Sequence, residues 1–351
     1  MSRRIFERFL MPSFALISVL ILAACLFAGG AAKADTSLNV TKIGALAGGL
    51  PREVFVLGNY AYVAAESALS VVDISNPSTP VQVGCAETWG YANSVYVTGG
   101  YVYVAAGSTG LLIMYNDPAA PIMIDYYDTP GDAQDVFVSG VYAYVADGDS
   151  GLRIIDVSNP ASPYEIGFYE NQDWFISVYV SGNYAYVVDD NYILRIIDVS
   201  NPAAPSEVGY YQMPWGANSV YVSGSYAYIT DGYSGLRIIN VSNPASPVEV
   251  GYYDTLGNAY GVYVSGGYAY VSVSDSHFSG LRIIDVSNPA APIEVGYHRT
   301  PGAAAIGVFA TGGYAYVSCD DCGYSIFQIT GADTTLPVQS GWDPPKGGII
   351  N

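Results

Sequence analysis

The chain has 351 residues, of which 51% are hydrophobic and 14% aromatic, and its formal net charge is −19 at pH 7. Its 33 tyrosines, 39 glycines and 20 prolines indicate a turn-rich β protein and exclude a disordered chain. The negative charge also excludes nucleic acid as a partner, because the field of the protein would repel a phosphate backbone.

Residues 1–34 are expected to be a signal peptide. Three arginines precede an apolar run over residues 9–26, and Ala32-Lys33-Ala34 reads as a small-x-small cleavage site. Leu22-Ala23-Ala24-Cys25 also matches a bacterial lipoprotein signal, so a lipid anchor at Cys25 is the alternative. Either signal predicts a secreted or extracytoplasmic protein, in the periplasm or at the cell surface. Without residues 1–34 the net charge becomes about −22, which favours solubility.

A Tyr-x-Tyr pair recurs seven times along the rest of the chain. The first tyrosines of the pairs are Tyr60, Tyr101, Tyr142, Tyr184, Tyr226, Tyr268 and Tyr314. A repeat of about 42 residues with this much self-similarity predicts one supersecondary unit copied in tandem.

Each unit reads as four short strands rich in Val, Ile and Tyr. In one copy they are Val220–Gly224, Tyr226–Thr230, Leu236–Ser242 and Val248–Tyr253, with Gly, Pro, Asn or Ser between them. The fourth strands of the first six copies are expected to begin at Val81, Ile122, Tyr164, Ser206, Val248 and Ile293. Four antiparallel strands per repeat of this length are typical of a β-propeller blade. Strand alternation places both tyrosines of a pair on one face, where we expect them to pack between blades.

The copy number predicts an all-β fold, a seven-bladed β-propeller of four-stranded antiparallel blades over residues 41–330. The last copy lacks a fourth strand of its own. Thr41–Gly44 has the required pattern, so we expect this N-terminal strand to pair with the C-terminal blade, Val308–Thr330, and to close the ring. The alternative is Pro337–Trp342 in the C-terminal tail, residues 331–351.

The sequence leaves open the thiol state of the three cysteines beyond the signal. Cys319 and Cys322 can form a local disulfide or remain free thiols. Cys85 can be an ordinary strand residue, or it can meet that pair where the ring closes.

The third strand of the repeat carries a family resemblance. Leu152-Arg-Ile-Ile-Asp156 recurs at residues 194–198 and 281–285, and with a final Asn at residues 236–240. This resembles the LVIVD repeat of exported bacterial and archaeal proteins, over about residues 41–330. The resemblance implies a propeller with a secreted or surface interaction role, and it supplies no catalytic residues. The copies at Leu111–Tyr115 and Tyr324–Gln328 depart from it because they lack the Asp.

The loops on the two sides of the predicted disc differ in variability. The links between first and second strands, and between third and fourth strands, are monotonous. The links between second and third strands, and from each blade to the next, carry nearly all the unusual residues, and we call their side the variable face. Its candidate binding residues are Trp89, Tyr127, Trp174, Tyr211, Trp215, Tyr253 and His298. The tryptophans are the stronger candidates because they interrupt the repeat.

The residues just before each first strand are expected to line the mouth of the central channel. The candidates there are Arg52, Glu53, Asn93, Gln134, Asp135 and Asn218. We expect no enzyme, since the two histidines, His277 and His298, lie outside that ring and cannot build a metal centre or a nucleophile-base pair. The carboxylates Glu53 and Asp135 keep a hydrolase or lyase as an alternative.

Two further sets of charged residues have simpler expected roles. Arg153, Arg195, Arg237 and Arg282 repeat at one strand position, which predicts pairing with nearby Asp or with backbone carbonyls between blades. No cofactor is expected, although Asp147 and Asp149 cluster oxygens that calcium could use.

The sequence as a whole predicts a monomeric propeller at the cell surface. Its aromatic, acidic variable face suits a protein or a carbohydrate ligand. A purely structural role in an envelope layer is the remaining alternative. The identity of the ligand cannot be deduced from the sequence.

Overall fold

A computed structural model describes residues 36–37, 40–46, 49–275, 278–300, 304–320 and 323–330. These residues form 29 strands and no helix, so none of them belongs to a helix that could cross a membrane. The expected signal peptide with Cys25, the tail at 331–351, His277 and Cys322 lie outside the described residues.

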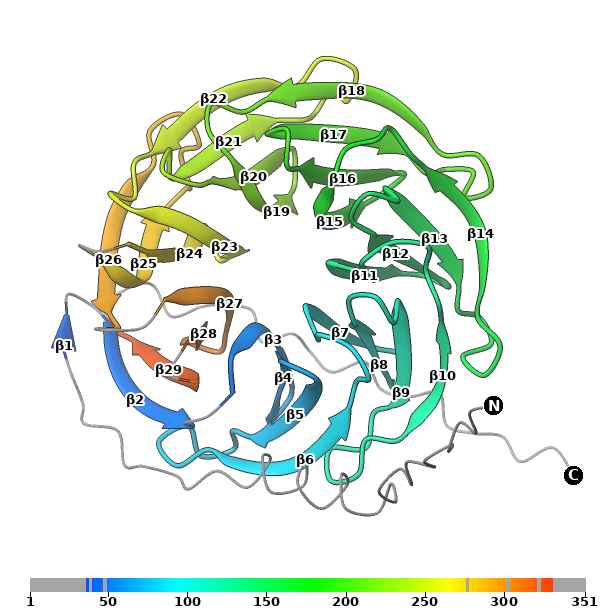
Figure 1. Ribbon diagram of the computed structural model, residues 1–351. Coiled ribbons are helices and arrows are strands. Elements are labelled where there is room, and N and C mark those ends of the chain that lie inside the picture. Colours follow the sequence, from blue (N-terminus) through cyan, green and yellow to red (C-terminus); the bar gives the residue numbers. More distant parts are fainter. Residues whose placement is uncertain are drawn as a thin grey trace, which may run out of the picture.

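The strands form seven sheets arranged around a central channel, as Figure 1 shows. Blades 1 to 3 are β3 (Pro51–Leu57), β4 (Tyr60–Ala65), β5 (Ala68–Asp73), β6 (Val81–Glu87); β7 (Ser94–Thr98), β8 (Tyr101–Ala105), β9 (Leu111–Tyr115), β10 (Met123–Tyr127); and β11 (Asp135–Ser139), β12 (Tyr142–Ala146), β13 (Leu152–Asp156), β14 (Tyr164–Tyr169). Blades 4 to 6 are β15 (Phe175–Ser181), β16 (Tyr184–Asp189), β17 (Ile193–Asp198), β18 (Ser206–Gln212); β19 (Ala217–Ser223), β20 (Tyr226–Asp231), β21 (Leu236–Asn240), β22 (Val248–Tyr253); and β23 (Asn258–Ser265), β24 (Tyr268–Ser274), β25 (Ser279–Asp285), β26 (Ile293–Arg299).

Blade 7 contains strands from both ends of the propeller. It combines β27 (Ala305–Thr311), β28 (Tyr314–Cys319) and β29 (Gly323–Ile329) with β2 (Val40–Leu46), which pairs antiparallel with β29 from Val40 opposite Ile329 to Leu46 opposite Tyr324. The predicted seven blades and N-terminal closure are therefore confirmed. A two-residue strand, β1 (Thr36–Ser37), adds a fifth strand outside β2, which the sequence did not predict.

The core lies between blades, and the Tyr-x-Tyr pairs build it. The second tyrosine of each pair is at most 5% exposed. Tyr62 of blade 1, for example, packs with Val95 and Val97 of blade 2, and Tyr316 of blade 7 packs with Val54 of blade 1. The recurring tyrosines thus pack between blades, as the strand alternation predicted.

The two cysteines that the structure describes are not free thiols. Cys85 lies on β6 and Cys319 at the buried end of β28, and both are disulfide-bonded.

Candidate functional site

The six residues predicted for the channel mouth line one cavity of about 290 Å³. Arg52 and Glu53 lie on β3, Asp135 begins β11 and Asn218 lies on β19, while Asn93 and Gln134 immediately precede β7 and β11. The regular position before each first strand brings them together, because all seven first strands run along the channel (Figure 1).

Hydrogen bonds between neighbouring blades hold the wall of this mouth. The backbone N–H of Val95 donates to Glu53 at 3.1 Å. Asp135 accepts from the Ser94 hydroxyl of blade 2 at 2.7 Å, and from the Ser177 hydroxyl and Val178 N–H of blade 4 at 2.8 Å each. Asp135 is therefore a fixed part of the wall.

In blades 5 to 7 the hydroxyl comes from the second strand. Thr230 donates to the Tyr260 carbonyl of blade 6 at 2.7 Å. Ser272 donates to the Ile306 carbonyl of blade 7, and Ser318 donates to the Arg52 carbonyl of blade 1 at 3.0 Å. The Val220 N–H of blade 5 donates to the Ser177 hydroxyl of blade 4 at 3.4 Å, so every blade is joined to the next at the level of the mouth.

Glu53 occupies an unusual electrostatic position in this wall. Burial and the nearby Asp135 carboxylate raise the pKa of Glu53 to about 8, and its hydrogen bonds with Ser94 and Val95 oppose that rise only partly. Glu53 is consequently mostly protonated at neutral pH, and the mouth carries less negative charge than its residue types suggest.

Beneath the mouth, seven aromatic side chains form a closed belt, one from each first strand. Their ring centroids are 4.3–5.1 Å from those of both neighbours, and adjacent ring planes are inclined by 38–58°. The members are Phe55, Tyr96, Phe137, Tyr179, Tyr221, Tyr263 and Phe309. Around these rings the channel narrows to a cavity of about 140 Å³. This belt was not predicted, although an aromatic residue between two small apolar ones recurs in every first strand and could have revealed it.

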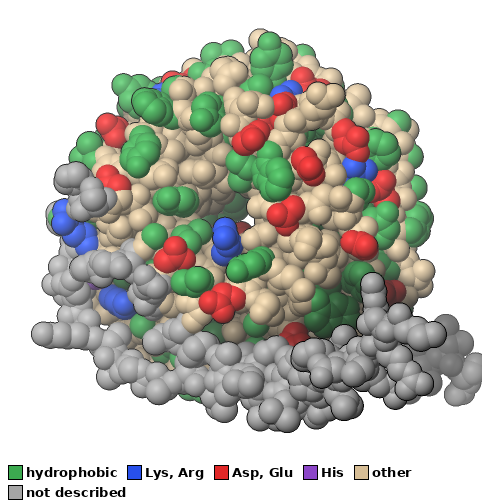
Figure 2. Space-filling view, viewed as in Figure 1, with side chains coloured by type: hydrophobic (Ala, Val, Ile, Leu, Met, Phe, Trp, Pro, Cys, Tyr) green, Lys and Arg blue, Asp and Glu red, His purple; other side chains and the backbone are tan. Residues whose placement is uncertain are grey.

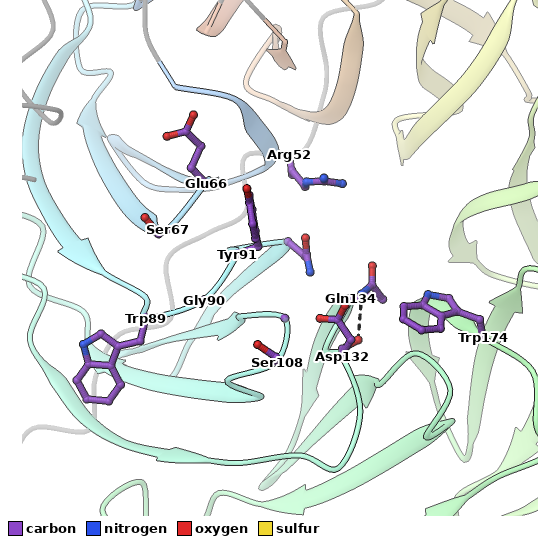
Figure 3. A pocket seen from close by; sticks show the side chains of 12 residues that line it. Arg52, Glu66, Ser67, Trp89, Gly90, Tyr91, Ser108, Asp132, Gln134 and Trp174 are labelled. Atoms are coloured by element: carbon purple, nitrogen blue, oxygen red, sulfur yellow. Dashed lines mark hydrogen bonds between the residues drawn. The ribbon is translucent and has the colours of Figure 1, made fainter. Parts of the chain in front are cut away.

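A wider basin of about 840 Å³ opens above the mouth on the variable face. Trp89 and Trp174 lie on opposite sides of it, and Arg52 and Tyr91 project between them (Figure 3). Arg52, Asn93 and Gln134 line both the basin and the mouth, so the two cavities are continuous.

The loop at Trp89 holds the indole outward. Trp89 has a φ of 56°, a left-handed conformation that residues other than glycine rarely adopt. The Thr88 hydroxyl donates to the Gly90 carbonyl at 2.8 Å across this turn, and the Trp89 side chain is 62% exposed. Glu66, which also lines the basin described above, shares this conformation, as do Gln172, Tyr192 and Leu256.

The other variable-face candidates lie elsewhere. Trp215 is equally exposed but lines neither cavity. The hydroxyls of Tyr211 and Tyr253 donate to Glu249 and Glu294 of the following blade, each at 3.2 Å. Tyr127 is half-buried at the end of β10 and packs between blades 2 and 3.

His298 is also held inside the fold. It is 1% exposed, and its ring packs 4.8 Å from that of Phe327. His298 interrupts the repeat as the tryptophans do, but it lies on strand β26 and its side chain points into the core.

The repeated arginines form ion pairs with carboxylates of their own blades. Arg195 pairs with Asp189 and Glu207, both at 2.8 Å, and Arg237 pairs with Asp231 and Glu249, both at 3.4 Å. The predicted pairing with nearby Asp is present, with Glu of the fourth strand as an added partner. These four pairs lie within a blade, but Arg153 and Arg195 also pair with Glu170 and Asp173, which lie in the link between blades 3 and 4.

The proposed calcium residue Asp147 is fully buried and already has partners. Its carboxylate accepts from the Thr129 hydroxyl at 2.6 Å and from the Gly131 N–H at 2.8 Å, with Arg153 at 3.9 Å. Burial raises the pKa of Asp147 to about 6. Among the described residues, no group of three or more His, Cys, Asp or Glu could hold a metal ion.

Comparisons with known proteins agree on the repeat and the fold. The sequence pattern of the LVIVD repeat matches residues 48–88, 89–129, 130–171, 176–213, 216–255 and 256–300. No curated protein matches the chain.

Solved propellers resemble the chain in structure at low sequence identity. The Cps50 (Swd1) β-propeller domain of Myceliophteria thermophila is 11% identical, with a TM-score of 0.67 over 86% of this chain and 100% of that one. A putative 6-phosphogluconolactonase of Bacteroides fragilis is 14% identical, with a TM-score of 0.65 over 87% and 94%. The Pan2 WD40 domain of Neurospora crassa is 12% identical, with a TM-score of 0.67 over 84% and 97%. At these identities the likeness concerns the fold alone.

Proposed function

The chain belongs to the LVIVD repeat family, and we propose that it is an exported binding protein that holds a carbohydrate in the basin and channel mouth of its variable face. Export rests on the pattern of residues 1–34 and on the resemblance of the repeats to those of exported proteins.

The observation that carries this proposal is the pair of tryptophans across one polar basin. Trp89 and Trp174 both line a space of about 840 Å³ whose other lining combines serine and amide side chains with charged residues, Tyr91 and glycines. The Trp89 indole packs edge-on against Tyr126, with the ring centroids 5.8 Å apart, and its exposed surface remains open to a ligand. A sugar ring has apolar faces that stack on indoles and a rim of hydroxyl groups that need hydrogen-bond partners. The basin offers both, in the volume range of ligand pockets.

The amide groups of the mouth suit the same ligand. The side-chain N–H groups of Asn93 and Asn218 donate to the Ala133 and Ala259 carbonyls of the next blades, at 2.9 and 2.7 Å. These bonds fix the amides and leave their side-chain oxygens as acceptors for ligand hydroxyls.

A protein ligand is the second candidate. Trp215, Tyr233 and Leu256 are exposed by 62%, 64% and 68% on loops of the variable face, and exposed aromatic residues are common anchors at interfaces. On the face in Figure 2, acidic side chains surround the central opening and a basic side chain lies at its rim.

Hydrolysis at the mouth would require Glu53 as the acid, since it is the carboxyl group there with a pKa near neutrality. Asp135 accepts hydrogen bonds from both sides of the wall, which suits a structural role better than a catalytic one. Turnover of any glycoside that survives both Glu53→Gln and Asp135→Asn would remove this alternative.

The test compares tryptophan variants on a glycan array and by titration calorimetry with the glycans that bind. Trp89→Ala and Trp174→Ala should each weaken binding about tenfold or more, because each removes a stacking platform worth about 1–2 kcal/mol. Trp215→Ala is the matched control, since it removes an equally exposed indole outside the basin. If all three variants bind as the wild type does, the basin is not the site.

A further inference from the structure

Arg52 differs from the repeated arginines because it forms no ion pair with another described residue. Arg153, Arg195, Arg237 and Arg282 are each paired with carboxylates of their own blade. Arg52 is exposed at the start of β3, and no ion pair among the described residues includes it. Its guanidinium lies where the basin and the mouth meet (Figure 3).

Neither carboxyl group of the mouth forms an ion pair with this guanidinium. Asp135 is satisfied by hydroxyl and N–H donors of the wall. Burial and the neighbouring Asp135 raise the pKa of Glu53 to about 8, so Glu53 is mostly uncharged at neutral pH. Arg52 is therefore a cation without a direct ion-pair partner, at the mouth of a strongly acidic protein.

The basin beyond the mouth carries acidic side chains. Glu66 and Asp132 line it on either side, and neither forms an ion pair with Arg52. A densely charged polyanion would be repelled by these carboxylates. A ligand with one anionic group at the mouth and neutral rings in the basin would avoid that repulsion.

We propose that the site binds an oligosaccharide that carries a single acidic sugar, with its carboxylate on Arg52 at the channel mouth and its neutral sugars in the basin that Trp89 and Trp174 line. A guanidinium recognises a carboxylate through two parallel N–H donors, which gives geometric specificity as well as affinity. This inference rests on the proposed carbohydrate function and adds the class of sugar to it.

The experiment uses an array of oligosaccharides that end in one uronate or sialate, beside the same oligosaccharides without the acid. The wild type should bind the acidic members at least about tenfold more tightly, as expected for a charge-assisted hydrogen bond in a pocket. Arg52→Gln should remove that preference and leave the binding of neutral members unchanged. Arg299→Gln is the control, because it removes an exposed positive charge on β26, outside both cavities.

The outcomes separate the two proposals. Binding that depends on Trp89 and Trp174 but shows no preference for acidic sugars overturns the role of Arg52 and keeps the carbohydrate function. An equal loss of preference in Arg299→Gln means that net charge, not the site, selects the acid. Binding of peptides through their terminal carboxylates in an Arg52-dependent manner, with no sugar bound, overturns the ligand class. No binding of any sugar overturns both proposals.

Discussion

At the scale of single residues, Glu53 makes a measurable contribution to the dependence of stability on pH. Its pKa is raised in the folded protein to about 8 from 4.5, so the native state holds this proton more tightly than the unfolded chain does. The corresponding stabilisation is fully present below pH 4.5 and is lost as the pH rises through about 8. Ionised Glu53 must then face Asp135 in a buried wall.

We therefore predict that Glu53→Gln flattens the decline of stability between pH 6.5 and pH 9. Urea denaturation at several pH values should show a wild-type free energy of unfolding that falls over this interval by roughly 1–3 kcal/mol, and a variant whose value changes by less than half of that. Glu66→Gln is the control. Because Glu66 is exposed in the basin, its substitution should leave the dependence of the free energy of unfolding on pH as in the wild type. Equal slopes for the wild type and Glu53→Gln would show that Glu53 ionises normally.

The residue scale also shows what the sequence could and could not predict. Arg52, Glu53 and Asn218 were predictable as neighbours because their distance from each first strand is fixed by the repeat. His298 and Trp174 both interrupt the repeat, yet one is buried and the other lines the basin. The difference depends on where a strand ends and a loop begins, and periodicity alone does not define that boundary. The raised pKa of Glu53 depends on burial and on Asp135, 82 positions away, so no local pattern reveals it.

At the scale of strands, the hydroxyl groups that form inter-blade bonds at the mouth lie on either the first or the second strand of a blade. Blades 2 and 4 place a serine on the first strand, Ser94 or Ser177, opposite Ala105 or Val188 of the second. Blade 6 reverses this arrangement. It has Gly261 on the first strand, and Ser272 on the second donates to Ile306 of blade 7. A Cβ on Gly261 would lie 2.6 Å from the Ile306 carbonyl oxygen and 3.0 Å from the Ser272 hydroxyl oxygen.

This exchange predicts a non-additive pair of substitutions. Ser272→Ala should destabilise the protein by about 1–2 kcal/mol, because it leaves the Gly261 N–H, which donates to Ser272 at 2.8 Å, without that partner. Gly261→Ser alone should cost about 1–3 kcal/mol through crowding. The double variant rebuilds the arrangement of blade 2, so its cost should fall below the sum by at least about 0.5 kcal/mol. Thermal denaturation of the four proteins measures the coupling, and strict additivity would contradict the exchange.

The positions of the strands were largely predictable, because the repeat places the same turn residues at the same distance in each blade. Five of the six predicted fourth strands begin at the expected residue, and β10 begins at Met123, one residue after the expected Ile122. Glycine, proline and asparagine at the turns fix these starts. The aromatic residue that recurs between two small apolar ones in every first strand was the available sign of the belt, but it does not show how each ring meets the ring of the next blade.

At the scale of the whole molecule, the seven blades were predictable from copy number, and the closure followed from the missing fourth strand. The short strand β1 was not predictable, since two residues carry no periodicity. The closure also unites positions 40 and 329 in one sheet, so the stability of the ring depends on contacts between the two ends of the propeller.

The last prediction tests this closure. Deleting residues 36–46 should expose the edge of β29 and the apolar side chains that β2 covers, among them Phe327 and Ile329, which are at most 4% exposed and pack with Val40. An unpaired strand edge favours association with other chains. The deletion should therefore lower the melting temperature by 10 °C or more, on the order expected for the loss of a few kcal/mol from one domain, and produce oligomers on size-exclusion chromatography. Deleting residues 331–351, the alternative source of a closing strand, should leave both measurements unchanged. If the tail deletion were the one that opened the ring, β2 would not be the closing strand, because β29 already pairs with β28 on one edge and can pair with only one strand on the other.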